Sequence, residues 1–275
     1  LLYIRRVRRR IGFTQNICIK VSRFILAYLL SLTVLHAQHK LVGSTKLHSQ
    51  VIAADVDRAG NFYMMGNDTI RRYSSVGVLE KTTHCPTPAI LNAHDGNHLF
   101  IYKNTTRTYQ FLSPDFSLLS ETQVDTLTVS KPQYACPAMD GSVWVLDAQD
   151  YQLKNIKHNA AIIKTISLPD TCQLADITQL RAYQNFIFML HKEKSILIFN
   201  SIGTLVKTIQ TPRIRYFNFL GEELYFLRDA NTLQCFDIFS ADVRTITLPA
   251  PCTTALLTDS TLALINTNSI AWYAQ

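Results

Sequence analysis

The sequence predicts an all-β fold, a six-bladed β-propeller whose blades each contain four strands. Three observations predict it. Short apolar runs recur at a near-constant spacing, a second series of apolar runs keeps step with the first, and residues 38–275 show no amphipathic helical period. A repeat of about 40 residues with four short strands is typical of a propeller blade. We therefore expect a single propeller domain over residues 38–275.

The first series of apolar runs predicts the second strand of each blade. The first residues of successive runs are 37, 44, 43, 38 and 38 residues apart. Most runs follow a turn signal such as Gly60-Asn61 or Asp140-Gly141. The six runs are Phe62–Met65, Leu99–Tyr102, Val143–Leu146, Phe186–Leu190, Leu224–Leu227 and Leu262–Ile265.

The second series predicts the third strand of each blade. Its apolar residues advance by 39, 44, 43, 37 and 37 positions, and short polar turns separate it from the first series. A fourth strand-like segment begins six or seven residues later, for example at Leu79 and Leu205. The last apolar residues of the second series are Tyr73, Leu112, Ile156, Phe199, Phe236 and Tyr273.

The ring is expected to close through the N-terminal strand. The sixth unit lacks a fourth strand, because the sequence ends at Gln275, just after Tyr273. The segment Leu41–Thr45 fits the missing strand, since Leu41 precedes Phe62 by 21 residues and equivalent distances elsewhere run from 19 to 25. Pairing of this strand with the last blade would cover strand edges that an open ring exposes.

Residues 1–37 have the pattern of a secretory signal peptide. A cationic region ends at Arg23, the apolar run Phe24–Leu35 follows, and Ala37 precedes the expected cleavage point. A bilayer span takes about 20 apolar residues, more than this run contains. We expect an exported protein that is periplasmic, associated with the outer envelope, or secreted. The alternative is that the leader is not cleaved and anchors the protein in a membrane. We expect no other contact with a membrane.

The basic character of the chain belongs to the leader. The sequence holds 27 basic and 20 acidic residues, and seven of the basic ones, but no acidic one, lie in residues 1–38. Residues 39–275 therefore hold equal numbers of both, which provides no argument for nucleic-acid binding.

An odd number of cysteines follows the leader. In an oxidising compartment this leaves at least one thiol unpaired or paired between molecules. A disulfide among them is an open alternative, and no pairing follows from the sequence. The five are Cys85, Cys136, Cys172, Cys235 and Cys252.

Two units resemble known propeller repeats. Asp57–Tyr63 followed by Ile70–Leu79 resembles one repeat of the NHL or TolB-like class of six-bladed propellers, and Ile198–Val206 is similar to the same pattern. The resemblance implies the fold. It does not identify the function, because propellers include binding modules and unrelated enzymes.

Candidate metal ligands are few. Asp55-x-Asp57-x-x-Gly60 begins like a calcium loop, but the fifth position is Ala59 and the twelfth is Gly66, so we interpret it as a strand followed by a turn. Six-bladed lactonase-like enzymes hold a metal in the central channel, and similarity to them would make Asp55, Asn92 and Asn218 the candidates. No motif supports this set, and we expect no metal and no cofactor.

His94 and His98 have a spacing that suits a metal site on a helix. Because they flank Asp95-Gly96 in an expected hairpin turn, we interpret them as solvated turn residues.

The leading functional hypothesis is an exported, non-enzymatic binding module or scaffold for a protein or cell-envelope component. The alternative is a propeller enzyme, a metal-dependent lactonase-like hydrolase or a lyase, working in the channel. Proline-rich connections between blades share one face with the turns after each second strand. We expect partner binding there through Arg213, Arg215 and Tyr216, since Arg and Tyr are enriched at interface hot spots. A strand with alternating exposed basic residues is the simpler interpretation of this segment.

Overall fold

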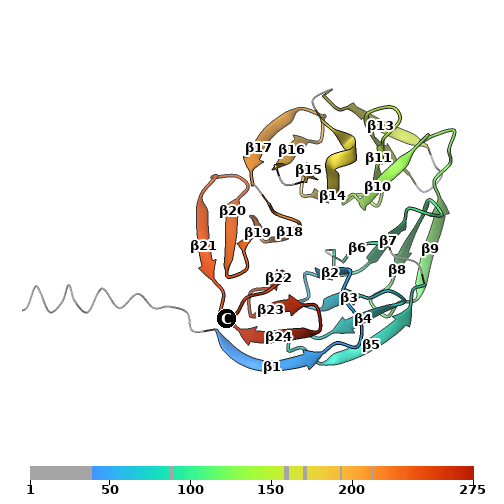
Figure 1. Cartoon of the computed structure of the whole chain (residues 1–275). Helices are drawn as coiled ribbons and strands as arrows, with labels where there is room; N and C mark the ends of the chain where they lie inside the picture. Colours follow the sequence, from blue (N-terminus) through green and yellow to red (C-terminus); the bar gives the residue numbers. More distant parts are fainter. Residues whose placement is uncertain are drawn as a thin grey trace, which may run out of the picture. The chain divides into compact units, whose positions relative to one another are not determined.

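Six antiparallel sheets of four strands each surround a central channel and form a closed ring, as Figure 1 shows. The computed structural model describes residues 39–86, 89–93, 95–157, 161–169, 172–192, 194–211 and 213–275. The predicted six-bladed propeller is confirmed. The predicted signal peptide and His94 lie outside the described residues.

The first three blades follow one another along the chain, each with its first strand innermost. Blade 1 consists of β2 (Ala53–Val56), β3 (Phe62–Met65), β4 (Thr69–Tyr73) and β5 (Leu79–His84). Blade 2 consists of β6 (Ile90–Asn92), β7 (Leu99–Lys103), β8 (Thr108–Leu112) and β9 (Leu118–Gln123). Blade 3 consists of β10 (Pro132–Pro137), β11 (Val143–Asp147), β12 (Gln152–Ile156) and β13 (Ile162–Ser167).

The last three blades complete the ring, and a short 3-10 helix, η1 (Leu174–Asp176), precedes the fourth. Blade 4 consists of β14 (Ile177–Tyr183), β15 (Phe186–His191), β16 (Ser195–Asn200) and β17 (Leu205–Gln210). Blade 5 consists of β18 (Phe217–Leu220), β19 (Glu223–Asp229), β20 (Thr232–Asp237) and β21 (Val243–Thr247). Blade 6 consists of β22 (Thr254–Leu257), β23 (Thr261–Asn266), β24 (Ser269–Ala274) and, from the other end of the domain, β1 (Lys40–Lys46).

The predicted closing strand pairs as expected. β1 runs antiparallel to β24, with Leu41 opposite Tyr273 and Thr45 opposite Ile270. The indole nitrogen of Trp272 on β24 donates to Thr45 Oγ1 on β1 at 3.0 Å. The two ends of the propeller are thus joined within one sheet, which leaves neither blade 1 nor blade 6 without a neighbour.

Burial explains why the second strand of each blade reads as an unbroken apolar run. All four residues of β3 are buried, because both faces of the sheet pack against neighbouring blades. Residues of the outer strands are mostly exposed. In β9, for example, two exposed residues are followed by half-buried and exposed residues in alternation. The apolar core is accordingly divided into clusters, several of which lie between adjacent blades, such as the one between Tyr63 on β3 and Leu91 on β6.

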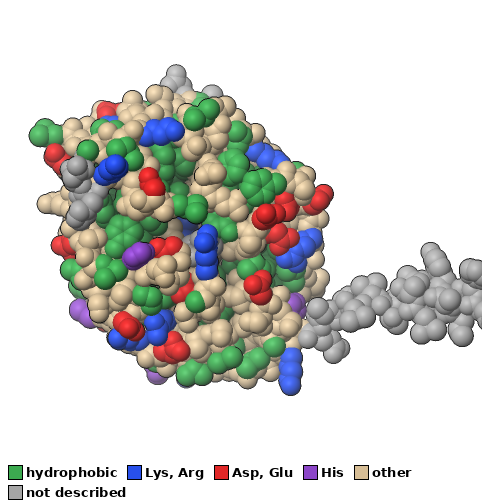
Figure 2. Space-filling view, turned by 180° about the vertical axis from the view of Figure 1, so that it is seen from behind, with side chains coloured by type: hydrophobic (Ala, Val, Ile, Leu, Met, Phe, Trp, Pro, Cys, Tyr) green, Lys and Arg blue, Asp and Glu red, His purple; other side chains and the backbone are tan. Residues whose placement is uncertain are grey.

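Each end of the ring carries a different set of connections. The turn face, seen in Figure 2, carries the turns from first to second and from third to fourth strands. The loop face carries the turns from second to third strands and the connections between blades. Within the described part of the chain, no helix is long and apolar enough to cross a membrane.

Candidate functional site

One register position of the inner strands forms a layer across the channel. In each blade this position lies opposite an equivalent residue of the second strand, for example Asp55 opposite Tyr63 and Arg181 opposite Phe188. The layer carries five polar or thiol side chains and one leucine. Its members are Asp55, Asn92, Cys136, Arg181, Asn218 and Leu256.

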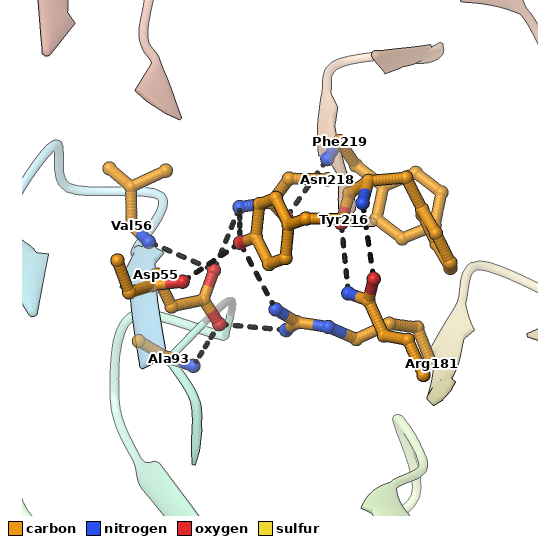
Figure 3. Close-up of polar contacts among 10 residues, drawn as sticks. Asp55, Val56, Ala93, Arg181, Tyr216, Asn218 and Phe219 are labelled. Carbon is orange, nitrogen blue, oxygen red and sulfur yellow. Dashed lines mark hydrogen bonds and ion pairs between the residues drawn. The ribbon is translucent and has the colours of Figure 1, made fainter. Parts of the chain in front are cut away.

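A buried ion pair spans the channel in this layer. Arg181 Nη1 lies 2.7 Å from Asp55 Oδ2, and Figure 3 shows the two side chains meeting from opposite sides of the ring. Asp55 is fully buried and Arg181 is 4% exposed. Because β2 and β14 belong to blades three places apart in a ring of six, this contact ties opposite blades together.

The Asp55 carboxylate has partners at both oxygens. Oδ1 accepts from Val56 N at 2.9 Å and from Asn218 Nδ2 at 2.8 Å. Oδ2 accepts from Ala93 N at 2.8 Å as well as from Arg181. The desolvation of this carboxylate is therefore compensated by four donors, one of them charged.

Tyr216 completes the network from the loop before β18. Its hydroxyl donates to Ala54 O at 2.9 Å and accepts from Asn218 Nδ2 at 3.0 Å and Arg181 Nη2 at 3.4 Å. Burial, followed by the Asp55 charge, raises the pKa of Tyr216 well above its usual value. Burial alone would lower the pKa of Arg181, but the Asp55 carboxylate outweighs it and holds that pKa above the usual value. Both groups therefore keep their protons at neutral pH.

This donor set does not fit a divalent cation. Asp55 and Asn218, two of the three metal candidates, do come together, but the Asn218 amide presents its nitrogen to the carboxylate and Arg181 supplies a fixed positive charge. Within the described residues, no three His, Cys, Asp or Glu side chains are grouped as metal ligands. Asp57 also has a structural partner, because its Oδ1 accepts a hydrogen bond from Asn61 N in the following turn at 2.8 Å.

The turn face holds a cavity of about 590 Å³. Blade 2 forms most of its wall, and blades 1, 3 and 4 contribute residues at or beside their first turns. These are Arg58, Pro137, Ala138, Met139, Gly141, Ala182, Tyr183 and Gln184. Asn92 of the channel layer is part of the lining. The cavity thus extends from the channel mouth toward the space between blades 2 and 3.

Aromatic rings of blade 2 pack together along one wall. The Phe100 ring centroid lies 5.3 Å from that of Phe111, and the His98 ring meets Phe111 edge-on at 6.1 Å. Leu119 and Met139, more than half exposed, add aliphatic surface at the mouth. Most of the lining is therefore apolar, with a few polar groups at its edge.

Hydrogen bonds within the first turn of blade 2 fix the polar residues at the edge of the cavity. Asp95 Oδ1 accepts from the backbone nitrogens of Asn97 and His98, and Asp95 Oδ2 lies 2.8 Å from His98 Nδ1. His98 is thus an exposed turn residue, as the sequence predicts, but its ring is oriented by a carboxylate. The imidazole and the carboxylate are both exposed at the edge of the cavity.

The predicted binding residues lie on the other face of the ring. Arg213 and Arg215 are exposed, whereas Tyr216 is half-buried with its hydroxyl bonded inside the channel. Ile214 between them is buried in the core of blades 4 and 5. The segment therefore presents two cations on the loop face, and the tyrosine anchors it to the channel layer.

The five described cysteines are buried, and Cys136, Cys172, Cys235 and Cys252 are free thiols. Burial raises the pKa of Cys136 to about 12 and the pKa values of Cys235 and Cys252 to about 11. Thiols with such pKa values are poor nucleophiles at neutral pH. The cysteines therefore act here as small core residues.

Sequence reasoning missed Arg181 and the cavity. Arg181 occupies the same register as Asp55, Asn92 and Asn218, so aligning the fourth unit with the others would have found it. The cavity has no comparable signal, because its lining comes from four blades.

Comparisons with known proteins support the fold. No protein-family model matches the sequence, and no curated protein matches it. Among solved structures, the chain is similar to a catalytically inactive variant of virginiamycin B lyase from Staphylococcus aureus, with quinupristin. The sequence identity is 13% and the TM-score 0.52, over 82% of this chain and 80% of that chain. A streptogramin B lyase structure has the same identity and TM-score, over 82% and 79%.

The WD40 domain of Neurospora crassa Pan2 is also similar. Its identity is 9% and its TM-score 0.58, over 86% of this chain and 95% of that chain. Identities this low show a shared propeller fold and no more.

Proposed function

We propose that this protein is an exported, non-enzymatic binding module that engages a protein or cell-envelope component through its turn face. The cavity at the channel mouth would receive an apolar group of the partner. The observation that carries this proposal is the cavity itself, about 590 Å³ with an aromatic wall. Ligand sites in proteins span about 300–1,000 Å³ and combine an apolar lining with a few polar groups.

The cavity walls are held in place before any ligand arrives. Tyr183 stacks on Phe219 with ring centroids 4.2 Å apart, and its hydroxyl donates to Gly221 O. The turn of blade 2 is fixed by Asp95, and the turn of blade 3 by Asp140, which accepts from Ser142 N at 3.1 Å. Binding to a pre-formed surface loses little conformational entropy.

The channel layer supports a scaffold role. A catalytic carboxylate needs an oxygen that can reach substrate, whereas Asp55 is fully buried and both its oxygens have partners. The layer therefore serves to hold opposite blades together. Arg213, Arg215 and Tyr216 stay the second candidate surface for the same function, on the loop face.

A neutral fluorescent probe tests the cavity directly. N-phenylnaphthylamine, which is apolar and uncharged, should bind the protein with increased emission. Replacing Leu119→Asn and Met139→Ser together removes exposed apolar wall and should weaken binding by roughly tenfold, from about 1.4 kcal/mol of lost contact. Thermal unfolding of each variant checks that the fold is intact.

Blade 4 offers a matched control. Val206 occupies the position of Leu119 in the outer strand of that blade, is 48% exposed and does not line the cavity. Val206→Asn should leave probe binding unchanged. Equal weakening by both changes, or no binding to the unaltered protein, would refute the site. Chemical conversion of a captured ligand would instead favour the enzyme alternative.

A further inference from the structure

The turns of the turn face carry more exposed acidic than basic residues. Among the described residues of these turns, six exposed carboxylates stand against two exposed cations, Arg58 and Lys157. Figure 2 shows acidic side chains spread over this face, with Lys and Arg side chains among them. The six are Asp95, Asp115, Asp140, Glu222, Asp242 and Asp259.

Much of this charge is not neutralised by neighbouring cations. Asp115 lies 3.7 Å from both Arg72 and Lys81, and Asp95 lies 2.8 Å from His98. On blade 5 the ion pairs formed by described residues join Arg228 to Asp229 and Arg244 to Glu223, and none reaches Glu222, Asp242 or Asp259. The face therefore keeps a negative field, although residues 39–275 carry equal numbers of acidic and basic residues.

Apolar surface continues outward from the cavity within the same face. Leu118 and Leu119 at the start of β9 are 57% and 53% exposed, and Met139 in the first turn of blade 3 is 71% exposed. Leu119 and Met139 belong to the cavity lining. An apolar anchor point is thus set in a face of negative charge.

We propose that the partner of the turn face is a basic protein segment that places one aromatic or branched apolar side chain in the cavity. This rests on the proposed function and specifies the partner. Lysines and arginines around the anchor would face the carboxylates, and the anchor would displace water from the aromatic wall. An anionic lipid surface would be repelled, and a second copy would bring two acidic faces together.

Three short peptides test the partner's chemistry. The first has lysines around one phenylalanine, the second has alanine in place of the phenylalanine, and the third has glutamates in place of the lysines. The first should bind tightest. The second and third should each bind at least roughly tenfold more weakly, since each lacks one of the two complementary features.

Substitutions distant from the cavity test the electrostatic part. Glu222→Gln with Asp259→Asn removes two charges that do not line the cavity, and should slow association of the first peptide by roughly fivefold at low salt. The effect should vanish near 1 M salt, where the screening length is about 3 Å. Asp68→Asn, which removes an exposed charge from the loop face, is the control and should have no such effect.

The outcomes separate this inference from the proposed function. If N-phenylnaphthylamine binds the cavity while the lysine and glutamate peptides bind equally, the cavity function stands and the basic partner is refuted. Binding of anionic vesicles, or concentration-dependent self-association that Leu119→Asn abolishes, would also refute it. If neither the probe nor any peptide binds, both proposals fail.

Discussion

The ion pair between Asp55 and Arg181 should dominate the stability of the ring. Replacing Arg181→Met keeps most of the side-chain volume but leaves Asp55 fully buried, facing only neutral donors. Breaking a buried pair in this way costs about 3–5 kcal/mol. A domain of this kind has a total stability of about 5–15 kcal/mol, so the variant should lose a large share of it.

Urea unfolding followed by tryptophan fluorescence measures the effect, because Trp144 and Trp272 are both buried. The double variant Asp55→Asn with Arg181→Met removes the uncompensated charge and should recover at least about 2 kcal/mol in a double-mutant cycle. Arg244→Met is the control: its pair with Glu223 is exposed, and such pairs contribute about 0–1 kcal/mol. Equal losses for Arg181→Met and Arg244→Met would refute the structural role of the channel pair.

Three further predictions concern the ring and its turns. Deleting residues 40–46 removes β1 and should abolish cooperative thermal unfolding by exposing the edge of β24; an unchanged melting profile would contradict ring closure. Gly77→Ala should lower the free energy of unfolding, measured in urea, by about 2–4 kcal/mol, because φ is +81° and the new Cβ would lie 2.5 Å from the Trp272 ring. Gly141→Ala is the control: φ there is +78° but the surrounding space is open, so the loss should be only about 1 kcal/mol. For Asp147, burial raises the pKa, but hydrogen bonds from Lys154 and three backbone N–H groups outweigh it and lower the pKa. Its contribution to stability is therefore complete above about pH 4 and lost as the pH falls further, and Asp147→Asn should flatten the acid limb of the stability curve.

The repeat could be predicted from the sequence because each blade solves the same packing problem. The second strands are buried on both faces and therefore appear as apolar runs, whose spacing predicted the number of blades. The missing fourth strand of the last unit then predicted that β1 closes the ring. Asp55, Asn92 and Asn218 were candidates because lactonase-like enzymes bind a metal through acidic and amide side chains of inner strands. Arg181 is a cation and no metal ligand, so a search for metal ligands missed it although it lies in the same layer.

The cavity could not be predicted in the same way. Its lining combines residues from four blades, among them Phe111, Leu119 and Met139, and no local sequence pattern indicates that they surround one cavity. The proline-rich connections predicted partner binding on the loop face. A sequence indicates where loops lie, but it does not indicate where the folded surface forms a cavity. Binding through the loop face stays the alternative, and in that case replacing Arg215 and Tyr216 together by Ala, with the fold intact, would weaken capture of the native partner by tenfold or more.

Photo-crosslinking in the native host tests the central claim most directly. A photoreactive amino acid is placed at Met139, which lines the cavity, or at Arg213, which is exposed on the loop face. Binding through the turn face predicts a covalent adduct with a protein partner from position 139 and none from position 213. An adduct from position 213 alone, or from neither position, would contradict it.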